Sequence, residues 1–213
     1  MEINYLVIEG NIGSGKTTLT NMIAKEFGAR TLLEGFEDNP FLPKFYKEPD
    51  KYAFPLEMAF LADRYNQLSK NVPEFELFSS FVVSDYYFAK SLIFAANTLS
   101  NDEYNLYQRF FQIVYDRIPK PDLYVYLHVR PENLLKNIRK RGREYEQSIS
   151  MEYLSQIESG YFRYFKERTD FPIVLIDMDK VDFVANSEDY KKILGIIFDN
   201  KFSPGINRVL LDG

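Results

Sequence analysis

Apolar runs and stretches with a helical spacing of apolar residues alternate along the 213 residues of the chain. Short, nearly continuous apolar runs are typical of strands in a sheet that is covered on both faces. The predicted strands are residues 5–9, 31–34, 81–84, 123–129 and 173–177. The predicted helices are residues 17–27, 54–68, 86–97, 102–117, 132–141, 151–168 and 187–198. This alternation predicts an α/β fold with a five-stranded, largely parallel sheet and helices on both of its faces.

Local signals fit these boundaries. Ser100 followed by Glu103 is the signature of a capping box, which predicts that a helix starts there. No internal repeat, low-complexity tract or linker divides the chain. We therefore expect one domain over residues 1–199. Residues 200–213 contain a proline and a glycine and are expected to form an irregular tail.

A glycine-rich segment directly after the first predicted strand has the P-loop pattern G-x-x-x-x-G-K-[ST]. It reads Gly10-Asn11-Ile12-Gly13-Ser14-Gly15-Lys16-Thr17 and is followed by Thr18. The glycines let backbone N–H groups turn toward a phosphate, and the next helix points its positive end at the same place. Lys16 would reach the outer phosphates and the Thr17 hydroxyl would coordinate Mg²⁺. The segment therefore predicts a P-loop NTPase fold that binds a nucleoside triphosphate.

Two carboxylates close predicted strands, and ligands in sheets of this type lie beyond the carboxyl ends of the strands. Glu34 ends the second strand, where it can accept the proton of an attacking hydroxyl; the alternative is a solvated charge. Asp85 follows the third strand, where an acid of a P-loop fold usually works on Mg²⁺, directly or through water. Its alternative role is the N-cap of a helix that starts near Tyr86.

The only dense basic cluster ends the fifth predicted helix and is called the lid segment below (residues 139–146). It reads Arg139-Lys140-Arg141-Gly142-Arg143-Glu144-Tyr145-Glu146. Guanidinium groups suit the oxygens of a phosphoryl group in transfer, and a glycine at the break suits a lid that closes to exclude water. The alternative is simple cationic stabilisation of a helix C-terminus, which needs fewer charges.

Composition narrows the function further. Hydrophobic residues make up 46% of the chain and charged residues 27%, as in ordinary globular proteins. No run of about 18 apolar residues is present, so we expect no membrane partner. The net charge of −5 argues against a duplex nucleic-acid partner. The absence of cysteine excludes thiolate chemistry and fits a cytoplasmic protein. The single histidine, His128, lies inside a predicted strand and is expected to be structural.

Taken together, these features resemble the deoxynucleoside kinase family. The segments that carry the resemblance are IEGNIGSGKTT at 8–18, Glu34 followed by Asn39-Pro40-Phe41, Tyr46-Lys47-Glu48-Pro49, and RGREYEQSI at 141–149. The resemblance covers almost the whole chain. Within the family, the chain looks most like the bacterial branch that is sometimes fused to a pterin pyrophosphokinase.

The resemblance implies a role for each matching residue. Glu34 corresponds to the general base for the nucleoside 5′-hydroxyl, and Tyr46 with Glu146 to the pair that binds the sugar 3′-hydroxyl. The lid arginines Arg141 and Arg143 correspond to residues on the donor phosphates. The segment Asp182-Phe183 falls where the family has its loop around the donor adenine. ATP and Mg²⁺ are the implied cofactors, and a homodimer through the helices predicted at 86–117 follows from the resemblance alone.

The chain departs from the family pattern at two places. The acid-Arg-[Ser/Thr] motif at the end of the third strand reads Asp85-Tyr86-Tyr87, so the acid is kept and the arginine is lost. The family glutamine that reads the base aligns with Glu57, and the usual acidic partner falls near Lys90 or Ser91.

The carboxylate of Glu57 could accept hydrogen bonds from N1–H and the amino group of guanine, whereas adenine offers one donor. Alternatively, Glu57 pairs with Lys90 or with Arg64 and serves structure. Glu57, Arg64 and Asp85 are all candidates for the acceptor pocket.

The combined prediction is an enzyme of nucleotide salvage that transfers phosphate from ATP–Mg²⁺ to the 5′-hydroxyl of a deoxynucleoside, a purine. One alternative is a nucleoside monophosphate kinase, although its acceptor phosphate needs an arginine and Tyr86 is a poor substitute. A second alternative is a degenerate family member that binds nucleotide without turnover, which the missing arginine favours.

Overall fold

The computed structural model describes residues 3–35, 39–75 and 81–209 of the chain. Its centre is a sheet of six strands, all paired in parallel, in the order β2-β3-β1-β4-β5-β6. The strands are β1 (Tyr5–Gly10), β2 (Arg30–Leu32), β3 (Val82–Ser84), β4 (Leu123–His128), β5 (Pro172–Asp177) and β6 (Gly205–Val209). The helices are α1 (Lys16–Phe27), α2 (Leu42–Lys47), α3 (Pro49–Phe75), α4 (Lys90–Thr98), α5 (Asn101–Tyr115), α6 (Pro131–Arg141), α7 (Met151–Lys166) and α8 (Ser187–Asp199), with a short 3-10 helix η1 (Glu144–Glu146). The predicted α/β fold class with a parallel sheet is confirmed.

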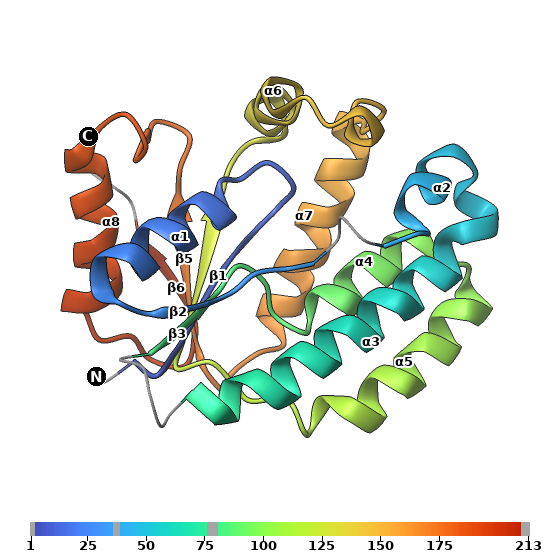
Figure 1. The fold of residues 1–213 in the computed structure, drawn as a ribbon, viewed down its shortest axis with the longest axis horizontal. Helices are drawn as coiled ribbons and strands as arrows, with labels where there is room; N and C mark the ends of the chain where they lie inside the picture. Colours follow the sequence, from blue (N-terminus) through green and yellow to red (C-terminus); the bar gives the residue numbers. More distant parts are fainter. Residues whose placement is uncertain (1–2, 36–38, 76–80, 210–213) are drawn as a thin grey trace.

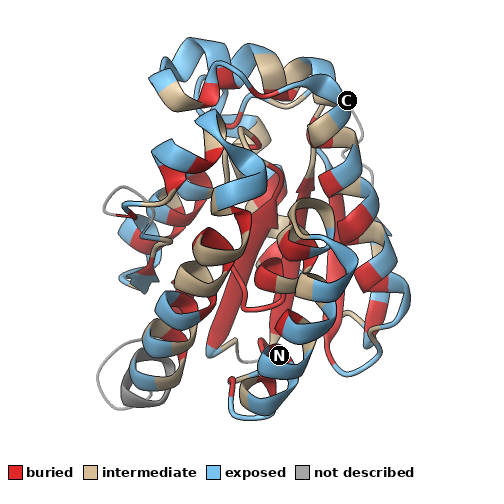
Figure 2. Cartoon of the chain, turned by 90° about the vertical axis from the view of Figure 1, so that its right-hand side faces the viewer, coloured by how far each residue is buried: buried red, intermediate tan, exposed pale blue. Residues whose placement is uncertain are grey.

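Helices cover both faces of the sheet (Figure 1). α1 and α8 pack on one face, while α3, α4, α5 and α7 contribute to the core on the other. Successive residues of a strand point to opposite faces. Thus Leu6 and Ile8 of β1 enter the first core and Val7 enters the second. Figure 2 shows the result, with buried strands between helices whose outer surfaces are exposed.

The sheet has one strand more than predicted. Gly205–Val209, which falls in the segment expected to be an irregular tail, forms β6 and pairs in parallel with β5. This strand lies at the edge of the sheet and is only partly buried, so it lacks the continuous apolar run that identified the other strands. Residues 210–213 of the predicted tail lie outside the described residues.

The helix after β3 starts later than predicted. We expected it at residue 86, but α4 begins at Lys90 with Ala89 as its N-cap. Before this helix, the backbone N–H of Tyr87 donates to a carboxylate oxygen of Glu9 in β1, at 3.0 Å. Asp85 consequently caps no helix here, which removes the alternative considered for it. The capping box of Ser100 and Glu103 at the start of α5 is confirmed.

Two short elements were not predicted. α2 lies between β2 and α3, and η1 lies within the lid segment. α3 is also longer than expected, running from Pro49 to Phe75 instead of over 54–68. Within the described part of the chain, no helix has the length and apolarity needed to cross a bilayer.

Candidate active site

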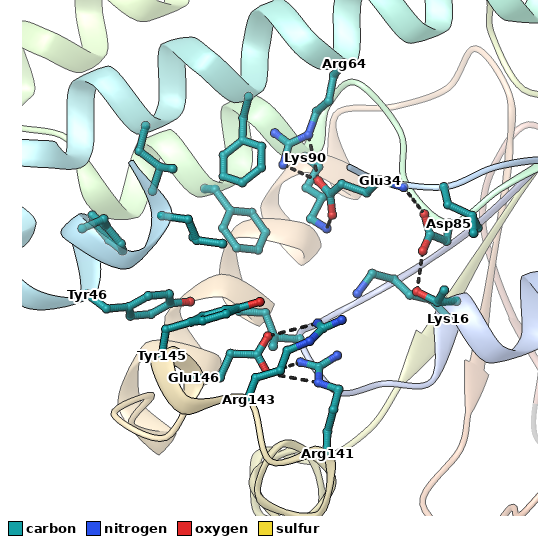
Figure 3. A pocket seen from close by; sticks show the side chains of 18 of the residues that line it. Lys16, Glu34, Tyr46, Arg64, Asp85, Lys90, Arg141, Arg143, Tyr145 and Glu146 are labelled. Atoms are coloured by element: carbon teal, nitrogen blue, oxygen red, sulfur yellow. Dashed lines mark hydrogen bonds and ion pairs between the residues drawn. The ribbon is translucent and has the colours of Figure 1, made fainter. Parts of the chain in front are cut away.

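The carboxyl ends of the central strands carry most of the residues singled out in the sequence. The P-loop follows β1, Glu34 lies two residues beyond β2, and Asp85 directly follows β3. Parallel strands end at the same edge of a sheet, so these three segments meet there. Figure 3 shows Lys16, Glu34 and Asp85 on one side of a cavity and the lid arginines below it.

The P-loop turns through two glycines with positive φ. Gly13 has a φ of 84° and Gly15 a φ of 89°, values that residues with a Cβ rarely adopt. A Cβ on Gly13 would also lie 3.0 Å from the carbonyl oxygen of Leu134. Gly15 is the N-cap of α1, and no side chain of the described residues caps this helix. The N–H groups of its first turn are thus left to a bound anion.

Asn11 anchors the P-loop to the rest of the domain. Its Nδ2 donates to the carbonyl oxygen of Leu154 in α7 at 2.8 Å, and its Oδ1 accepts from the backbone N–H of Ile12 at 2.8 Å. The side chain of Ile12 lines the cavity beside the loop. Asn11 was predicted as a nucleotide contact; in this geometry its amide holds the loop in place.

Asp85 connects its own segment to the P-loop and to the segment that carries Glu34. One carboxylate oxygen accepts a hydrogen bond from the backbone N–H of Glu34 at 2.8 Å, and the other accepts from the hydroxyl of Thr17. Lys16 lies beside them, and burial, followed by the nearby charge of Lys90, lowers the pKa of its ammonium group to about 8. The acid after β3 therefore sits against the P-loop.

Thr17 and Asp85 supply a donor set that fits Mg²⁺. This ion prefers oxygen ligands and is usually held by one or two carboxylates together with substrate phosphates and water. The contact between the Thr17 hydroxyl and the Asp85 carboxylate places two such oxygens side by side. No cluster of three or more His, Cys, Asp or Glu residues occurs among the described residues, so this set suits a shared ion and not an all-protein cage.

Glu34 is held by two cations from two different helices. Arg64 of α3 donates to one carboxylate oxygen through Nε at 3.0 Å and Nη2 at 2.6 Å, and Lys90 of α4 donates to the other. The Glu34 side chain is only 10% exposed. Burial alone would raise its pKa, but the charges of Lys90 and Arg64 outweigh burial and hold the pKa well below its usual range. Glu34 is therefore ionised and fixed in orientation.

Glu57 has the opposite electrostatic setting. One carboxylate oxygen accepts from the Thr98 hydroxyl at 3.0 Å, whereas the other is buried with no hydrogen-bond partner among the described residues. Arg64 and Lys90, the cations considered as its partners, pair with Glu34 instead. Burial raises the pKa of Glu57 to about 7, although the charge of Arg64 opposes this shift. A second carboxylate thus stands in the cavity without an ion pair.

Two cavities meet at the P-loop. The first has a volume of about 460 Å³, and its walls include all of the residues predicted for the acceptor pocket: Glu34, Tyr46, Glu57, Arg64, Asp85 and Glu146. The second, of about 410 Å³, lies between the P-loop and α6. Both are lined by Lys16, Thr17, Thr18 and Arg141. Cavities of this size suit small ligands, and the shared wall places two ligands next to each other.

The lid segment folds over the first cavity. α6 ends at Arg141 with Gly142 in the left-handed region, and η1 follows. Arg141 donates to Glu146 through Nε at 3.0 Å, and Arg143 donates to the same carboxylate at 3.4 Å. Glu146 is buried, whereas the Arg141 side chain is 36% exposed. The two arginines are thus held at the cavity edge by one acid.

Tyr46 also reaches this cavity. Its ring stacks on that of Tyr145 with centroids 5.9 Å apart, and burial together with the charge of Glu146 raises its pKa. Tyr46 and Glu146, which the family resemblance placed on one sugar hydroxyl, line the same cavity.

The predicted adenine loop lies beside the P-loop but outside both cavities. Phe183 packs against Gly15, where a Cβ would meet its ring at 3.2 Å. Asp182 accepts hydrogen bonds from the backbone N–H groups of Val184 and Ala185 at 3.2 and 3.0 Å, closing its own turn. Neither Asp182 nor Phe183 is among the described residues that line the two cavities.

Sequence reasoning missed two buried charges. Lys90 was considered only as a partner of Glu57. Glu9 was counted as the end of a strand, yet it is fully buried and accepts three hydrogen bonds, from the N–H of Gly10 at 3.1 Å, the N–H of Tyr87 at 3.0 Å and the hydroxyl of Tyr161 at 2.9 Å. A carboxylate in an otherwise apolar strand was the available signal for Glu9.

The tyrosines that follow Asp85 leave the cavity open. Tyr86 is buried and its hydroxyl donates to Gln67 at 2.5 Å. Tyr87 is also buried, and its ring packs edge-on against the rings of Tyr124 and Phe171. Neither is among the residues that line the cavity beside Glu34.

Comparisons with known proteins point to one family. The family model described as deoxynucleoside kinase matches residues 6–202. The chain is 37% identical to the deoxyguanosine kinase of Bacillus subtilis (strain 168), over 89% of this chain and 93% of that protein. It is 34% identical to the deoxyguanosine kinase of Lactobacillus acidophilus, over 92% and 90%, and 30% identical to the deoxyadenosine kinase of the same organism, over 90% and 94%.

Solved structures give the same result. The deoxyadenosine kinase from M. mycoides with bound dCTP has a TM-score of 0.77 and 25% identity, with 92% of this chain and 100% of that chain covered. The same enzyme with the products dCMP and a flexible dCDP has a TM-score of 0.80 and 26% identity.

The three hydrogen bonds to Glu9 generate a stability prediction. In Glu9→Gln, an amide NH₂ would replace one of the two oxygens that now accept a hydrogen bond from a backbone N–H, so two donors would face each other. We therefore expect the free energy of unfolding to fall by about 1–3 kcal/mol. Urea denaturation followed by circular dichroism would measure it. Glu188→Gln, which alters an exposed ion pair with Lys191, is the matched control and should change stability by less than about 0.5 kcal/mol. Equal stability of Glu9→Gln and this control would contradict the role given to Glu9.

Proposed function

Because the chain belongs to the deoxynucleoside kinase family and phosphorylates nucleosides, we propose that it transfers the γ-phosphoryl group of ATP, with Mg²⁺, to the 5′-hydroxyl of a purine deoxynucleoside in nucleotide salvage. One observation carries this proposal. The fixed carboxylate of Glu34 and the P-loop lysine, Lys16, line the same cavity. A base and a phosphate-binding cation around one space are what transfer to a hydroxyl requires.

The donor side uses the P-loop and the lid segment. The triphosphate would lie on the backbone N–H groups of residues 10–15, with Lys16 and the arginines Arg141 and Arg143 on its oxygens. Thr17 and Asp85 would hold Mg²⁺, which neutralises charge on the phosphates when bound. The second cavity, between the P-loop and α6, leaves room for the donor nucleotide next to the acceptor cavity.

On the acceptor side, Glu34 orients the nucleophile. The 5′-hydroxyl donates a hydrogen bond to the carboxylate, its oxygen forms a bond to phosphorus, the bond to the ADP oxygen breaks, and the proton passes to Glu34. The low pKa of Glu34 makes it a weak base before transfer. This is sufficient because phosphoryl transfer passes through a loose transition state, in which the hydroxyl needs to lose its proton only late.

The purine preference rests on Glu57. Its buried oxygen without a partner and its second oxygen on Thr98 leave acceptor capacity directed at a ligand. Guanine offers two adjacent donors, N1–H and the amino group, which an ionised carboxylate accepts together. Adenine offers one donor next to an acceptor. This acceptor would face a carboxylate oxygen that is itself an acceptor, so no second hydrogen bond would form. Similarity to two deoxyguanosine kinases at 37% and 34% identity further supports deoxyguanosine as the preferred acceptor.

A homodimer completes the proposal. The outer surface of α5 carries Leu106, Phe110 and Ile113, which are 43%, 43% and 69% exposed. Their spacing of four and three residues places them on one side of the helix. An exposed apolar stripe of this kind marks a surface that another protein covers, and a second copy of this chain is the occupant we propose.

The substrate is tested with purified protein, ATP–Mg²⁺ and each of the four deoxynucleosides. We expect the highest kcat/KM for deoxyguanosine and a value lower by about 10- to 100-fold for deoxyadenosine, as follows from one lost buried hydrogen bond of about 1–3 kcal/mol. Initial rates of ADP formation measure this, and chelation of the divalent ion should stop turnover. A preference for thymidine or deoxycytidine would contradict the proposal.

The role of Glu57 predicts a pH-dependent selectivity. Its pKa is raised to about 7, so at lower pH it carries a proton and presents one donor and one acceptor, which match adenine. The ratio of kcat/KM for deoxyguanosine over deoxyadenosine should therefore rise as pH increases through about 7. In Glu57→Gln the amide presents a donor and an acceptor at every pH, so the ratio should fall at least about tenfold and lose its pH dependence.

Glu188→Gln serves as the control for this series, since Glu188 is exposed and lies outside the cavity. It should keep the wild-type ratio at each pH. A ratio in Glu57→Gln that follows the wild-type pH curve would remove Glu57 from base recognition.

The proposed dimer is tested by charging the stripe on α5. Ile113→Lys should shift the protein from dimer to monomer in sedimentation velocity at micromolar concentration, because a lysine would then be buried without a partner. Ile113 is 69% exposed, so the folded chain should tolerate the change. Gln112→Lys adds the same charge on another side of α5 and should leave the dimer intact. A monomeric wild-type protein would refute this part of the proposal.

A further inference from the structure

The two cations that hold Glu34 differ in what else they bind. Arg64 uses Nε and Nη2 on Glu34 and donates through Nη1 to the Ser91 hydroxyl at 2.8 Å. Its guanidinium group also lies 4.8 Å above the ring of Phe60. All three nitrogens of Arg64 are thus directed into the surrounding structure. Arg64 is a residue that positions Glu34.

Lys90, in contrast, has N–H donors that its hydrogen bond to Glu34 does not use. It is the first residue of α4, and its side chain is 6% exposed, yet it lines the cavity. The ammonium group has three N–H donors, and the hydrogen bond to Glu34 uses one of them. The ring of Phe94 lies 5.4 Å from Nζ and covers another side of the group. Lys90 therefore has N–H donors left for a ligand in the cavity that it lines.

Lys90 and Lys16 come from different elements and line the same cavity. Two ammonium groups in the wall of one cavity repel each other, and an anion between them relieves this repulsion. Figure 3 shows both side chains at this cavity, together with Glu34 and Asp85. An anion bound to Lys16 there would also be within the field of Lys90.

We propose that Lys90 is a catalytic residue that contacts the transferred phosphoryl group, and that its ammonium group passes from Glu34 to this group during the reaction. The inference rests on the proposed function, because it assigns a role within the same transfer. It also accounts for the arginine missing after Asp85. Tyr86 turns its hydroxyl to Gln67, and the cation at the acceptor comes from Lys90, four residues further along the chain.

The exchange of partners follows from charge. When Glu34 takes the proton of the 5′-hydroxyl, its carboxylate becomes neutral and attracts Lys90 less strongly. In the same step the 5′-oxygen bonds to phosphorus, the bond to the leaving ADP oxygen breaks, and negative charge remains on the transferred group. Lys90 then donates to the more negative partner. The cation thus holds the base before transfer and stabilises the product charge after it.

The first test compares Lys90→Met and Lys90→Arg with wild type. We expect kcat of Lys90→Met to fall about 100- to 1,000-fold, the usual loss for one such donor, and KM for the nucleoside to change by less than about fivefold. The acidic limb of the kcat profile should move to higher pH, because Glu34 loses one of its two cations. Lys90→Arg keeps the charge and should recover part of kcat. Lys191→Met, at an exposed ion pair, should match wild type.

The second test separates catalysis from simple support of Glu34. In a Glu34→Gln background the partner of Lys90 is neutral, so a residue that only pairs with Glu34 has no further effect. We expect Lys90→Met to lower the single-turnover rate of Glu34→Gln by at least about tenfold. An unchanged rate would overturn the inference. The double variant removes both charges of the pair together, so it leaves no unpaired Glu34 carboxylate in the fold.

A binding measurement decides the question without turnover. ADP with aluminium fluoride and deoxyguanosine mimics the transferring group, and calorimetry gives the increase in ADP affinity that the fluoride complex adds. This gain in ADP affinity should be smaller in Lys90→Met than in wild type by a factor of at least about ten. The affinity for ADP without fluoride should not change. An equal increase would contradict the role of Lys90. A wild-type protein that phosphorylates no deoxynucleoside would instead contradict the proposed function.

Discussion

A buried carboxylate must have cations beside it to remain ionised, and Glu34 imposes this condition on the whole active site. The negative charge of Glu34, two residues beyond β2, is 10% exposed and is balanced by Arg64 from α3 and Lys90 from α4. Removing one partner of such a pair costs about 3–5 kcal/mol, because the other charge is left buried. The ion pairs therefore tie two helices to the edge of the sheet and give one wall of the cavity its shape.

The pairing of both cations with Glu34 also determines the protonation of the second acid, Glu57. Since Arg64 and Lys90 are bound to Glu34, Glu57 has neither as an ion-pair partner, and its pKa lies near 7. Two carboxylates in one cavity thus have opposite properties, one permanently charged and one easily protonated. Environments that separate the pKa values of neighbouring acids are a common mark of functional sites, because they assign different tasks to chemically similar groups. Both acids line the cavity beside the P-loop, and base recognition by the titratable acid is part of the proposed function.

Several features could be predicted because each depends on residues that are adjacent in the sequence. The P-loop is a contiguous segment, and its glycines adopt the positive φ values that only such residues favour. The buried strands β1, β4 and β5 are contiguous apolar runs and were predicted nearly to their ends. The edge strand β6 escaped prediction because one covered face and one neighbour leave only a partial apolar pattern. The contact between Glu9 and the backbone N–H of Tyr87 also escaped prediction, because the two residues are 78 positions apart in the chain.

The sequence by itself determined the fold class, the phosphate-binding loop, the acids at the strand ends and the basic lid segment, since each depends on residues that are neighbours in the chain. Only the tertiary structure decided which charges meet. It brought Arg64 and Lys90 to Glu34, left one oxygen of Glu57 without a partner among the described residues, and turned Tyr86 away from the cavity. The physical reason is that ion pairs depend on separations of a few ångströms, and helix packing sets these separations among many possible partners.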